Sequence, residues 1–547
     1  MWCPSLIFKR TLQVLLVCLI ACQSDETQST NGESENRLQG DTLIASNMPD
    51  ALASDDEADR FSDAGTNDHH DDFNFADMML NTPADARLGG DLPTAQSGTG
   101  FAEQYQRWSV PQSGSEDGFF SLGWANGTRW FSIFDINGDG RSDIVQTASD
   151  QRANGFVWTD AGGAFWKVWL GKPNGFDDTY LRWSVPDSGL ADGFFFTAWN
   201  DGPRWFGVRD LNGDSIPDLI QTADSTREGG FVWQDTEGAY WKVWLGRAEG
   251  FAPDWIRWSV PQNGLNDGFF TLQWANGNRW FTVIDLDGDL KPELVQTAES
   301  DREGGYVFED QNGAYWRVWQ NHGHGFEMND NRWQVPDSGL ADGFFFPYWT
   351  MGERTFSVLD MNGDRQLDLV QTADSDRSGG HVWQDSQGPY WRVWLGTGDG
   401  FATTWTRWSV PESGLDDGFF ATWYLNGQRS FGTLDMTGDG IPDLVQTADS
   451  ARSGGHIWRD EVGTYWKVWA GTAEGFKRNV LRWSVPESGH SDGFYTTHSA
   501  SGERWFGIMD INGDGVPDLL QTGDTHRDGG FVWQDANGPY WKVWFGE

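Results

Sequence analysis

A nine-residue stretch rich in aspartate recurs six times in this chain at a constant spacing. The first copy, DINGDGRSD, spans residues 135–143, and each later copy begins 75 residues after the one before it. No insertion or deletion interrupts the series, whose first residues are Asp135, Asp210, Asp285, Asp360, Asp435 and Asp510. Such a period indicates one supersecondary unit that stacks against copies of itself. The chain must therefore be interpreted first as a repeat protein.

The stretch carries the ligand chemistry of a hard cation. Calcium takes six to eight oxygen ligands at about 2.3–2.6 Å, whereas magnesium demands a tighter octahedron. Side chains at positions 1, 3, 5 and 9 and the backbone carbonyl at position 7 supply such oxygens. Carboxylates this close repel one another unless a cation lies between them. We therefore expect up to six structural calcium ions, held by Asp135, Asn137, Asp139, Arg141 and Asp143; Asp210, Asn212, Asp214, Ile216 and Asp218; Asp285, Asp287, Asp289, Lys291 and Glu293; Asp360, Asn362, Asp364, Gln366 and Asp368; Asp435, Thr437, Asp439, Ile441 and Asp443; and Asp510, Asn512, Asp514, Val516 and Asp518.

Two other interpretations of the stretch can be weighed on the residues. Asp, Asn and Gly also form hairpin turns that bind nothing, and this alternative stays open. A helical EF-hand is disfavoured, because its twelfth position should hold a bidentate glutamate. That position is glutamine in every copy, beginning with Gln146. We expect the copies at Asp285 and Asp435 to be the weakest sites, because they depart from the pattern at Glu293 and Thr437.

Residues 98–547 read as a folded body made of short strands. Aromatic and β-branched runs such as 204–209, 219–222 and 240–245 are separated by Gly, Asp and Pro. No stretch keeps a helical period for three turns. In the run from Tyr240 to Trp244, bulky side chains fall on both faces of the strand. A sheet that is apolar on both faces must lie between neighbours, which is typical of a propeller blade.

The two ends of the body indicate a closed ring. The body begins with the RWSVP segment at 107–111, which in the other units follows the YWKVW strand, and it stops just after the last such strand, at Glu547. The first unit therefore lacks the strands that the last unit supplies. An open solenoid would instead show polar capping repeats at both ends. We predict an all-β fold, a six-bladed β-propeller built from six 75-residue repeats, with its termini joined in one blade.

These residues also carry a family resemblance. The DxNGDGxxD loop between two strands, followed by a V-W-L-G strand, a Gly-Phe pair and W-x-V-P, resembles the FG-GAP/VCBS repeats of bacterial surface proteins. The loop is similar to that of the integrin α-subunit β-propeller. The resemblance implies a propeller with calcium in loops on one face and an extracellular binding role. The units here are longer than usual, and there are six where integrin heads have seven.

The N-terminal sequence indicates that the protein is exported and anchored to a membrane. Lys9 and Arg10 precede an apolar run that is too short to span a bilayer and ends Leu19-Ile20-Ala21-Cys22. This end resembles the lipobox of bacterial lipoproteins, which implies a signal peptide over 1–22 and lipidation of Cys22. An ordinary signal peptide with an incidental cysteine is the alternative. Residues 23–97 carry 17 acidic residues against three arginines and no sustained apolar period, so we expect a disordered acidic tether.

The charge of the chain limits its partners. A formal net charge of −43 disfavours nucleic acid and anionic lipid headgroups, which it would repel. We therefore expect a calcium-binding surface protein of the bacterial cell envelope, placed at the outer membrane or cell surface and held to the membrane through its lipid alone. Its expected role is adhesion or binding, with a glycan or an extracellular protein as the ligand. An envelope scaffold without a small ligand is a second hypothesis.

Aromatic residues supply the candidate ligand contacts. Among 35 tryptophans most must fill the core, and the candidates for exposure precede the RWF strand: Trp124, Trp199, Trp274, Trp349 and Tyr424. The alternative is that each ring clamps its own hairpin. A polysaccharide-active enzyme on a propeller is a third hypothesis, for which the scattered histidines, such as His322, His324 and His498, would have to supply acid–base groups. No nucleophile elbow, zinc helix or phosphate loop is present, so we expect no enzyme and assign no catalytic residue.

Overall fold

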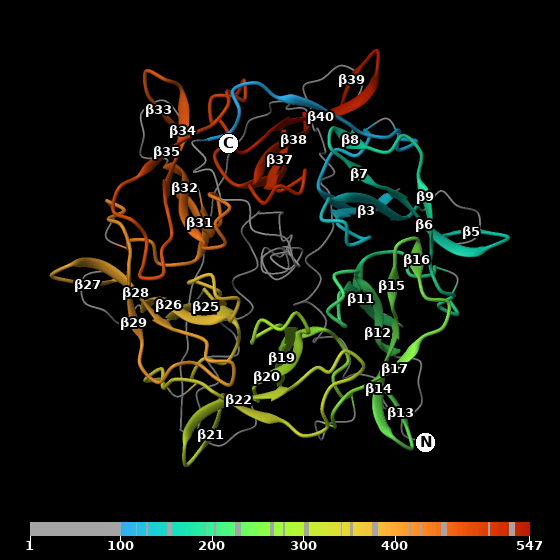
Figure 1. The fold of residues 1–547 in the computed structure, drawn as a ribbon, viewed down its shortest axis with the longest axis horizontal. Coiled ribbons are helices and arrows are strands. Elements are labelled where there is room, and N and C mark those ends of the chain that lie inside the picture. The colour runs from blue at the N-terminus through green and yellow to red at the C-terminus, as the bar shows by residue number, and fades with distance from the viewer. Residues whose placement is uncertain are drawn as a thin grey trace, which may run out of the picture. The chain divides into compact units, whose positions relative to one another are not determined.

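The computed structural model describes residues 100–547, with gaps at 116, 127–128, 150–155, 191, 202–203, 225–230, 263–266, 277–278, 300–305, 341, 351–353, 375–380, 415–416, 427–428, 450–456, 502–503 and 525–530. The segment 1–22, the acidic stretch 23–97 and Cys22 lie outside the described residues. All secondary-structure elements in the described residues are β-strands. The strands form an all-β propeller, with sheets standing around a common centre (Figure 1).

One repeat shows how each sheet is built. In the second repeat the hydrogen-bonded order is β10-β11-β12-β14-β13, and β17 also pairs with β14. These strands are β10 (Ala198–Asp201), β11 (Arg204–Arg209), β12 (Asp218–Asp224), β13 (Trp233–Asp235), β14 (Gly238–Trp244) and β17 (Ile256–Ser259). All neighbours in this sheet run antiparallel. Antiparallel pairing suits the short connections of the sequence, because such strands can be joined by tight hairpins.

The other repeats contain the equivalent strands. The strands equivalent to β10 are β2 (Gly123–Asn126), β18 (Gln273–Asn276), β24 (Tyr348–Trp349), β30 (Trp423–Asn426) and β36 (His498–Ser501). The strands equivalent to β11 are β3 (Arg129–Phe134), β19 (Arg279–Ile284), β25 (Arg354–Leu359), β31 (Arg429–Leu434) and β37 (Arg504–Met509). The strands equivalent to β12 are β4 (Asp143–Ala148), β20 (Glu293–Ala298), β26 (Asp368–Asp374), β32 (Asp443–Asp449) and β38 (Asp518–Asp524). The strands equivalent to β13 are β5 (Trp158–Asp160), β21 (Phe308–Asp310), β27 (Trp383–Asp385), β33 (Trp458–Arg459) and β39 (Trp533–Asp535). The strands equivalent to β14 are β6 (Gly163–Trp169), β22 (Gly313–Trp319), β28 (Gly388–Trp394), β34 (Thr464–Trp469) and β40 (Gly538–Trp544). The strands equivalent to β17 are β1 (Gln106–Ser109), β9 (Leu181–Ser184), β23 (Asn331–Gln334), β29 (Thr406–Ser409) and β35 (Leu481–Ser484). Two short hairpins join neighbouring sheets. One consists of β7 (Gly171–Lys172) and β8 (Gly175–Phe176), and β8 pairs with β1. The other consists of β15 (Gly246–Arg247) and β16 (Gly250–Phe251), and β16 pairs with β9.

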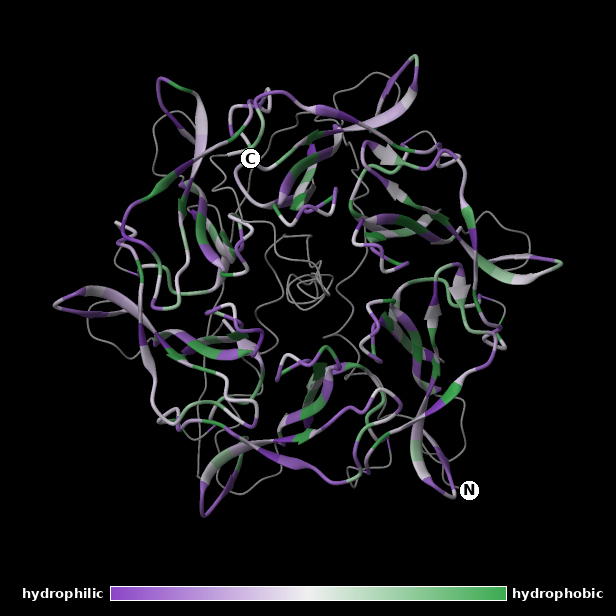
Figure 2. Cartoon of the chain, viewed as in Figure 1, coloured by the Kyte–Doolittle hydropathy of each residue, from purple (hydrophilic) through white to green (hydrophobic). Residues whose placement is uncertain are grey.

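The hydrophobic core lies between neighbouring sheets. Trp241 of β14 and Phe281 of β19 belong to one buried cluster, although they come from successive repeats. Trp241 is fully buried, as are its equivalents such as Trp166 and Trp391. Hydrophobic residues gather along β11, β12 and their counterparts (Figure 2). The expectation that both faces are covered is confirmed for β12, in which residues 218–223 are all buried, but only in part for β14, where Tyr240 and Lys242 are half-buried.

Contacts between repeats are cyclic. The indole N–H of Trp166 donates to the carbonyl oxygen of Phe194 in the next repeat at 2.7 Å. The last repeat makes the same bond backwards along the chain, from Trp541 to the carbonyl oxygen of Phe119 at 2.7 Å. Strand β1, at the start of the body, pairs antiparallel with β40 at its end. The expected joining of the two ends of the body in one sheet is therefore observed.

The six nine-residue stretches, which we call loops 1 to 6 in chain order, touch one another in the same cyclic way. Gly213, at position 4 of loop 2, has a φ of +78°, and a Cβ there would lie 3.0 Å from the carbonyl oxygen of Leu290 at position 6 of loop 3. Gly513 of loop 6 faces the carbonyl of Gly140 in loop 1 in the same manner. Glycine is needed at position 4 because both the positive φ and the close approach exclude a side chain.

Candidate cation site in loop 3

The first aspartate of every loop is engaged by the backbone of its own loop. In loop 1, Asp135 accepts hydrogen bonds from the N–H groups of Gly138 at 2.8 Å and Gly140 at 2.7 Å. The same two bonds occur at Asp210, Asp285, Asp360, Asp435 and Asp510. These bonds explain how a short acidic loop keeps its curl, as an Asx-type turn does. The turn interpretation therefore accounts for the shape of the loops.

The ninth residue of five loops is a buried carboxylate with both oxygens satisfied. Asp143 accepts hydrogen bonds from Ile136 at 3.1 Å and from Gly171 at 2.7 Å. Gly171 is the first residue of β7, the short strand that follows β6, so the carboxylate ties the loop to that strand. Burial raises the pKa of Asp143 to about 7. The equivalents of Asp143 and Gly171 make the same bonds in loops 2, 4, 5 and 6: Asp218 with Gly246, Asp368 with Gly396, Asp443 with Gly471, and Asp518 with Gly546.

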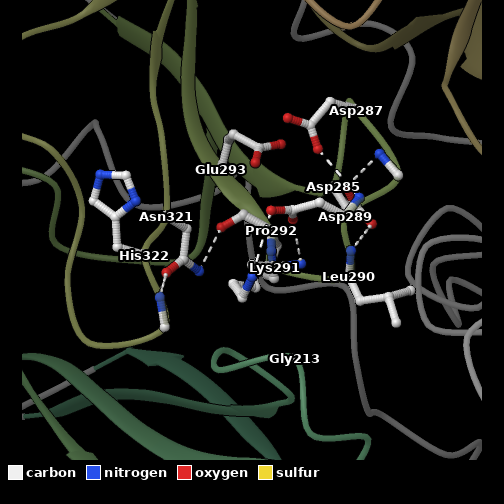
Figure 3. A network of polar contacts seen from close by, with 12 residues as sticks. Gly213, Asp285, Asp287, Asp289, Leu290, Lys291, Pro292, Glu293, Asn321 and His322 are labelled. Carbon is white, nitrogen blue, oxygen red and sulfur yellow. Dashed lines mark hydrogen bonds and ion pairs between the residues drawn. The ribbon is translucent and has the colours of Figure 1, made fainter.

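Loop 3, between β19 and β20, departs from this arrangement at two positions. Glu293 replaces the aspartate, and Asn321 replaces the glycine. Glu293 is fully buried; its Oε2 accepts a hydrogen bond from Leu286 at 2.8 Å, whereas its Oε1 has no hydrogen-bond partner among the described residues. The side chain of Asn321 instead donates to the carbonyl oxygens of Leu211 at 2.8 Å and Pro292 at 3.0 Å (Figure 3).

The longer side chain of Glu293 brings four carboxylates together. Asp285, Asp287, Asp289 and Glu293 each offer one oxygen, and these oxygens all lie within 4.8 Å of one another. In Figure 3 the carboxyl group of Glu293 faces Asp287 across the loop. Among the residues that the structure describes, this is the one group of at least three acidic, histidine or cysteine side chains with such spacing. An oxygen-only set of this kind suits a hard cation such as calcium.

The electrostatics of loop 3 also favour a cation. Burial raises the pKa of Glu293 well above its ordinary value, and the neighbouring Asp287 raises it further. Burial and repulsion from Asp289 likewise raise the pKa of Asp287. A bound cation would relieve both causes, because it replaces lost hydration and neutralises the repulsion. Sequence reasoning ranks loop 3 among the weakest sites. In the structure the carboxylate oxygens of Glu293 and of the three aspartates lie within 4.8 Å of one another, so the departure from the pattern at Glu293 keeps a clustered set of possible ligands.

The predicted ligand-binding aromatics lie on the innermost strands, half-buried against other rings. Trp124 of β2 packs edge-to-face on Phe120, with ring centroids 4.9 Å apart, and on Trp505 of the adjoining repeat at 5.7 Å. Trp199, Trp274, Trp349 and Tyr424 pack in the same way on Phe195, Phe270, Phe345 and Phe420. The four tryptophans also contact a tryptophan of the adjoining repeat, so packing between repeats is one of their roles.

A second aromatic series escaped the sequence reasoning. Tyr105, Tyr180, Trp255 and Trp405 stand two residues before the Arg-Trp-Ser-Val segment of their repeats, and each is more than two-fifths exposed. Their 75-residue spacing is the signal that could have revealed them. Periodicity alone does not separate an exposed ring from a packed one, because both series repeat equally well.

The histidines considered for an enzyme are dispersed over the propeller. The Nε2 of His322 contacts the Oε1 of Glu327 at 3.0 Å, and both side chains are exposed. His498 lies on β36 in another repeat, and its burial lowers its pKa to about 4. The described residues therefore do not join these two histidines in one acid–base site.

Comparisons with known proteins show no family for this chain. No family model and no curated protein matches the chain. Among solved structures, a lectin from Agrocybe aegerita that recognises non-reducing terminal N-acetylglucosamine is 17% identical, with a TM-score of 0.36, over 77% of this chain and 83% of the lectin. CoXyl43, a GH43 β-xylosidase/α-arabinofuranosidase from a compost metagenome, is 10% identical, with a TM-score of 0.22, over 64% of this chain and 96% of the enzyme. Such values transfer neither ligand nor activity. Within the described residues, no helix has the length and apolar character needed to cross a membrane.

Proposed function

We propose that this chain is a calcium-binding, lipid-anchored propeller of six blades that acts as a binding module at the bacterial cell surface. Six hydrogen-bonded sheets and cyclic contacts between the first and last repeats support one blade per repeat. The lipobox-like sequence at Leu19-Ile20-Ala21-Cys22 supports the anchor. The acidic surface and the stacked repeats, which offer several equivalent positions to a ligand, support binding of a glycan or an extracellular protein.

The observation that carries the calcium proposal is the unpartnered Oε1 of Glu293. A buried polar atom without a hydrogen bond costs roughly 1–3 kcal/mol, and more when the group is charged. Here it belongs to a fully buried carboxyl group in a cluster of four. A calcium ion would be held by Asp285, Asp287, Asp289 and Glu293, with the carbonyl of Lys291 as the expected fifth group. Loops 1, 2, 4, 5 and 6 are weaker sites in this proposal, because their ninth carboxylates already bond to backbone amides.

Calcium titration of the full chain tests the proposal. After EDTA treatment and its removal, isothermal titration with calcium should show one tight site and a set of weaker ones. Glu293→Gln keeps the shape of the side chain but removes its charge, so it should abolish the tight site. Asp368→Asn makes the equivalent change in loop 4 and should leave the tight site intact. Equal loss in both variants, or no calcium binding by the unsubstituted chain, would contradict the proposal.

A further inference from the structure

The outer edge of the propeller carries exposed aromatic rings that are held in place. Trp255 directly precedes β17 and is 42% exposed. Its ring stacks on that of Tyr240 in β14, with centroids 5.8 Å apart and planes 10° apart. Hairpin β13–β14, which carries Tyr240, lies at the periphery of the ring of sheets (Figure 1). A large aromatic side chain is thus presented to solvent by the sheet's outermost strands.

Charged residues fix the surroundings of Trp255. The ammonium group of Lys242 lies 5.5 Å from the centroid of Trp255 and 4.5 Å from that of Trp233, so it sits against both rings. Arg257 donates two hydrogen bonds to Asp235, each 2.9 Å long. Trp255 is therefore an exposed flat ring with a cation beside it, and the tyrosine on which it stacks lies under the guanidinium of Arg257, 5.0 Å from the Tyr240 centroid.

Two other repeats build the same stacked platform, and Tyr105 presents an exposed ring at the equivalent position. Trp405 stacks on Tyr390, with centroids 5.7 Å apart and planes 16° apart, and Arg392 lies 5.3 Å from the Trp405 centroid. Tyr180 stacks on Phe165 with planes 12° apart, and Lys167 lies 5.1 Å from its centroid. Tyr105, which is 43% exposed, differs in that its ring meets Trp544 edge-on, with centroids 5.8 Å apart, while Lys542 lies 5.4 Å from its centroid. The platform is therefore a recurrent construction.

The fold itself does not need the exposed ring. The equivalent position holds Asp330 in the third repeat and Val480 in the fifth. Nevertheless β22 pairs with β23, and β34 with β35, in the register that β14 and β17 use. Asp330 forms an ion pair with Arg317, and Val480 is 47% exposed. Since the strands pair equally well without a ring, packing does not explain why four repeats keep one.

We infer that Tyr105, Tyr180, Trp255 and Trp405 are stacking platforms for the pyranose rings of a neutral glycan. The C–H face of a pyranose is flat and weakly positive, which suits the negative face of an aromatic ring, while nearby polar groups can bond to its hydroxyls. A neutral ligand is favoured because the net charge of −43 repels anionic polymers. The four platforms belong to four different sheets around the periphery of the propeller (Figure 1), so they would offer a long polysaccharide several separate sites. The inference rests on the proposed function as a binding module and names its ligand class and contact residues.

Affinity electrophoresis of the full chain in non-ionic detergent tests this inference. The probes are gels that contain dextran, galactomannan or mixed-linkage β-glucan, each compared with a plain gel. At least one probe should retard the unsubstituted chain, and Trp255→Ala/Trp405→Ala should weaken that binding by about fivefold or more. Val480→Trp adds a fifth ring and should strengthen binding, whereas Val480→Ala, the matched control, should leave it unchanged. Near-ultraviolet circular dichroism checks that the variants fold.

The outcomes separate the inference from the proposed function. Equal retardation of the double variant and the unsubstituted chain would overturn the platforms while leaving a glycan-binding module in place. No retardation in any of the three gels would overturn the platforms and the glycan part of the proposed function, so that a protein ligand or a scaffold role would remain. Retardation that falls in the double variant and rises in Val480→Trp would support both.

Discussion

Gly171 donates its backbone N–H to the Oδ1 of Asp143 at 2.7 Å, and this single bond ties a nine-residue loop to the end of the strand beside it. The corresponding pair in loop 3 is Asn321 and Glu293, which do not form that bond. Asn321 turns its side chain to two backbone carbonyls, and Glu293 extends toward Asp287. Loop 3 thus differs from the other loops at Glu293 and Asn321 and also at Asp287, where they have Asn or Thr, and its ninth carboxylate belongs to a candidate cation site.

Restoring the Asp–Gly pair of the other loops in loop 3 should weaken cation binding and raise the stability of the metal-free protein. We expect Glu293→Asp/Asn321→Gly to lose the tight calcium site. In EDTA the variant should be more stable than the unsubstituted chain by about 1–3 kcal/mol, because its ninth carboxylate again accepts two hydrogen bonds. Thermal unfolding with and without calcium measures both effects. A variant that keeps the full calcium-induced rise in Tm would contradict the role of Glu293.

The metal-free chain should lose stability as the pH rises from about 4 to 8. Burial raises the pKa of Asp143, Asp368 and Asp443 to about 7 and that of Asp218 and Asp518 to about 8, against an ordinary value of 3.8. Between these values the folded chain holds protons that the unfolded chain has released. The folded state therefore binds more protons, and the free energy of unfolding falls through this window. Calorimetry in EDTA at several pH values tests the sign, and a Tm that rises from pH 5 to pH 8 would refute it.

Closure of the ring can be measured with two equivalent tryptophans. Trp541 bonds to Phe119 across the join between the ends of the body, whereas Trp241 bonds to Phe269 between consecutive repeats. Trp541→Phe and Trp241→Phe should each destabilise the protein by about 1–3 kcal/mol, since each leaves a buried carbonyl oxygen without its donor. Urea denaturation gives the comparison. If only Trp241→Phe shifts the midpoint, the join does not contribute to stability and the ring is open in solution.

The membrane anchor has a direct test in the bacterial host. Cys22→Ser removes the thiol on which the proposed lipidation depends, so the protein should move from the membrane fraction to the soluble fraction. Fractionation followed by immunoblotting shows its location. Ala21→Ser, a change at the neighbouring residue that keeps the thiol, serves as the control. Membrane retention of Cys22→Ser at the level of the control would exclude the lipid anchor.

Much of the fold could be predicted because its signals are local. The alternating bulk from Tyr240 to Trp244 indicates a strand that is covered on both faces, and the structure places Trp241 in a core between two sheets. The incomplete units at the two ends of the body predict the pairing of β1 with β40, which is observed. Strand periodicity and unit order are properties of the linear sequence, and a 75-residue repeat presents them six times.

The sequence by itself determined the strands, the acidic loops and the meeting of the two ends of the body. The sequence also shows that loop 3 alone has acidic residues at all four side-chain positions, because Asp287 stands where the other loops have Asn or Thr. Only the tertiary structure decided that these four carboxylates lie within 4.8 Å of one another and that Asn321, 28 residues from Glu293 in the chain, bonds to backbone carbonyls beside the loop. It also decided which aromatic series faces solvent. Trp124 and Trp255 recur with the same period, but Trp505 of the adjoining repeat packs against Trp124, whereas Trp255 lies at an edge where its ring stays 42% exposed. Burial is set by neighbours that are distant in sequence, and so a local pattern does not specify it.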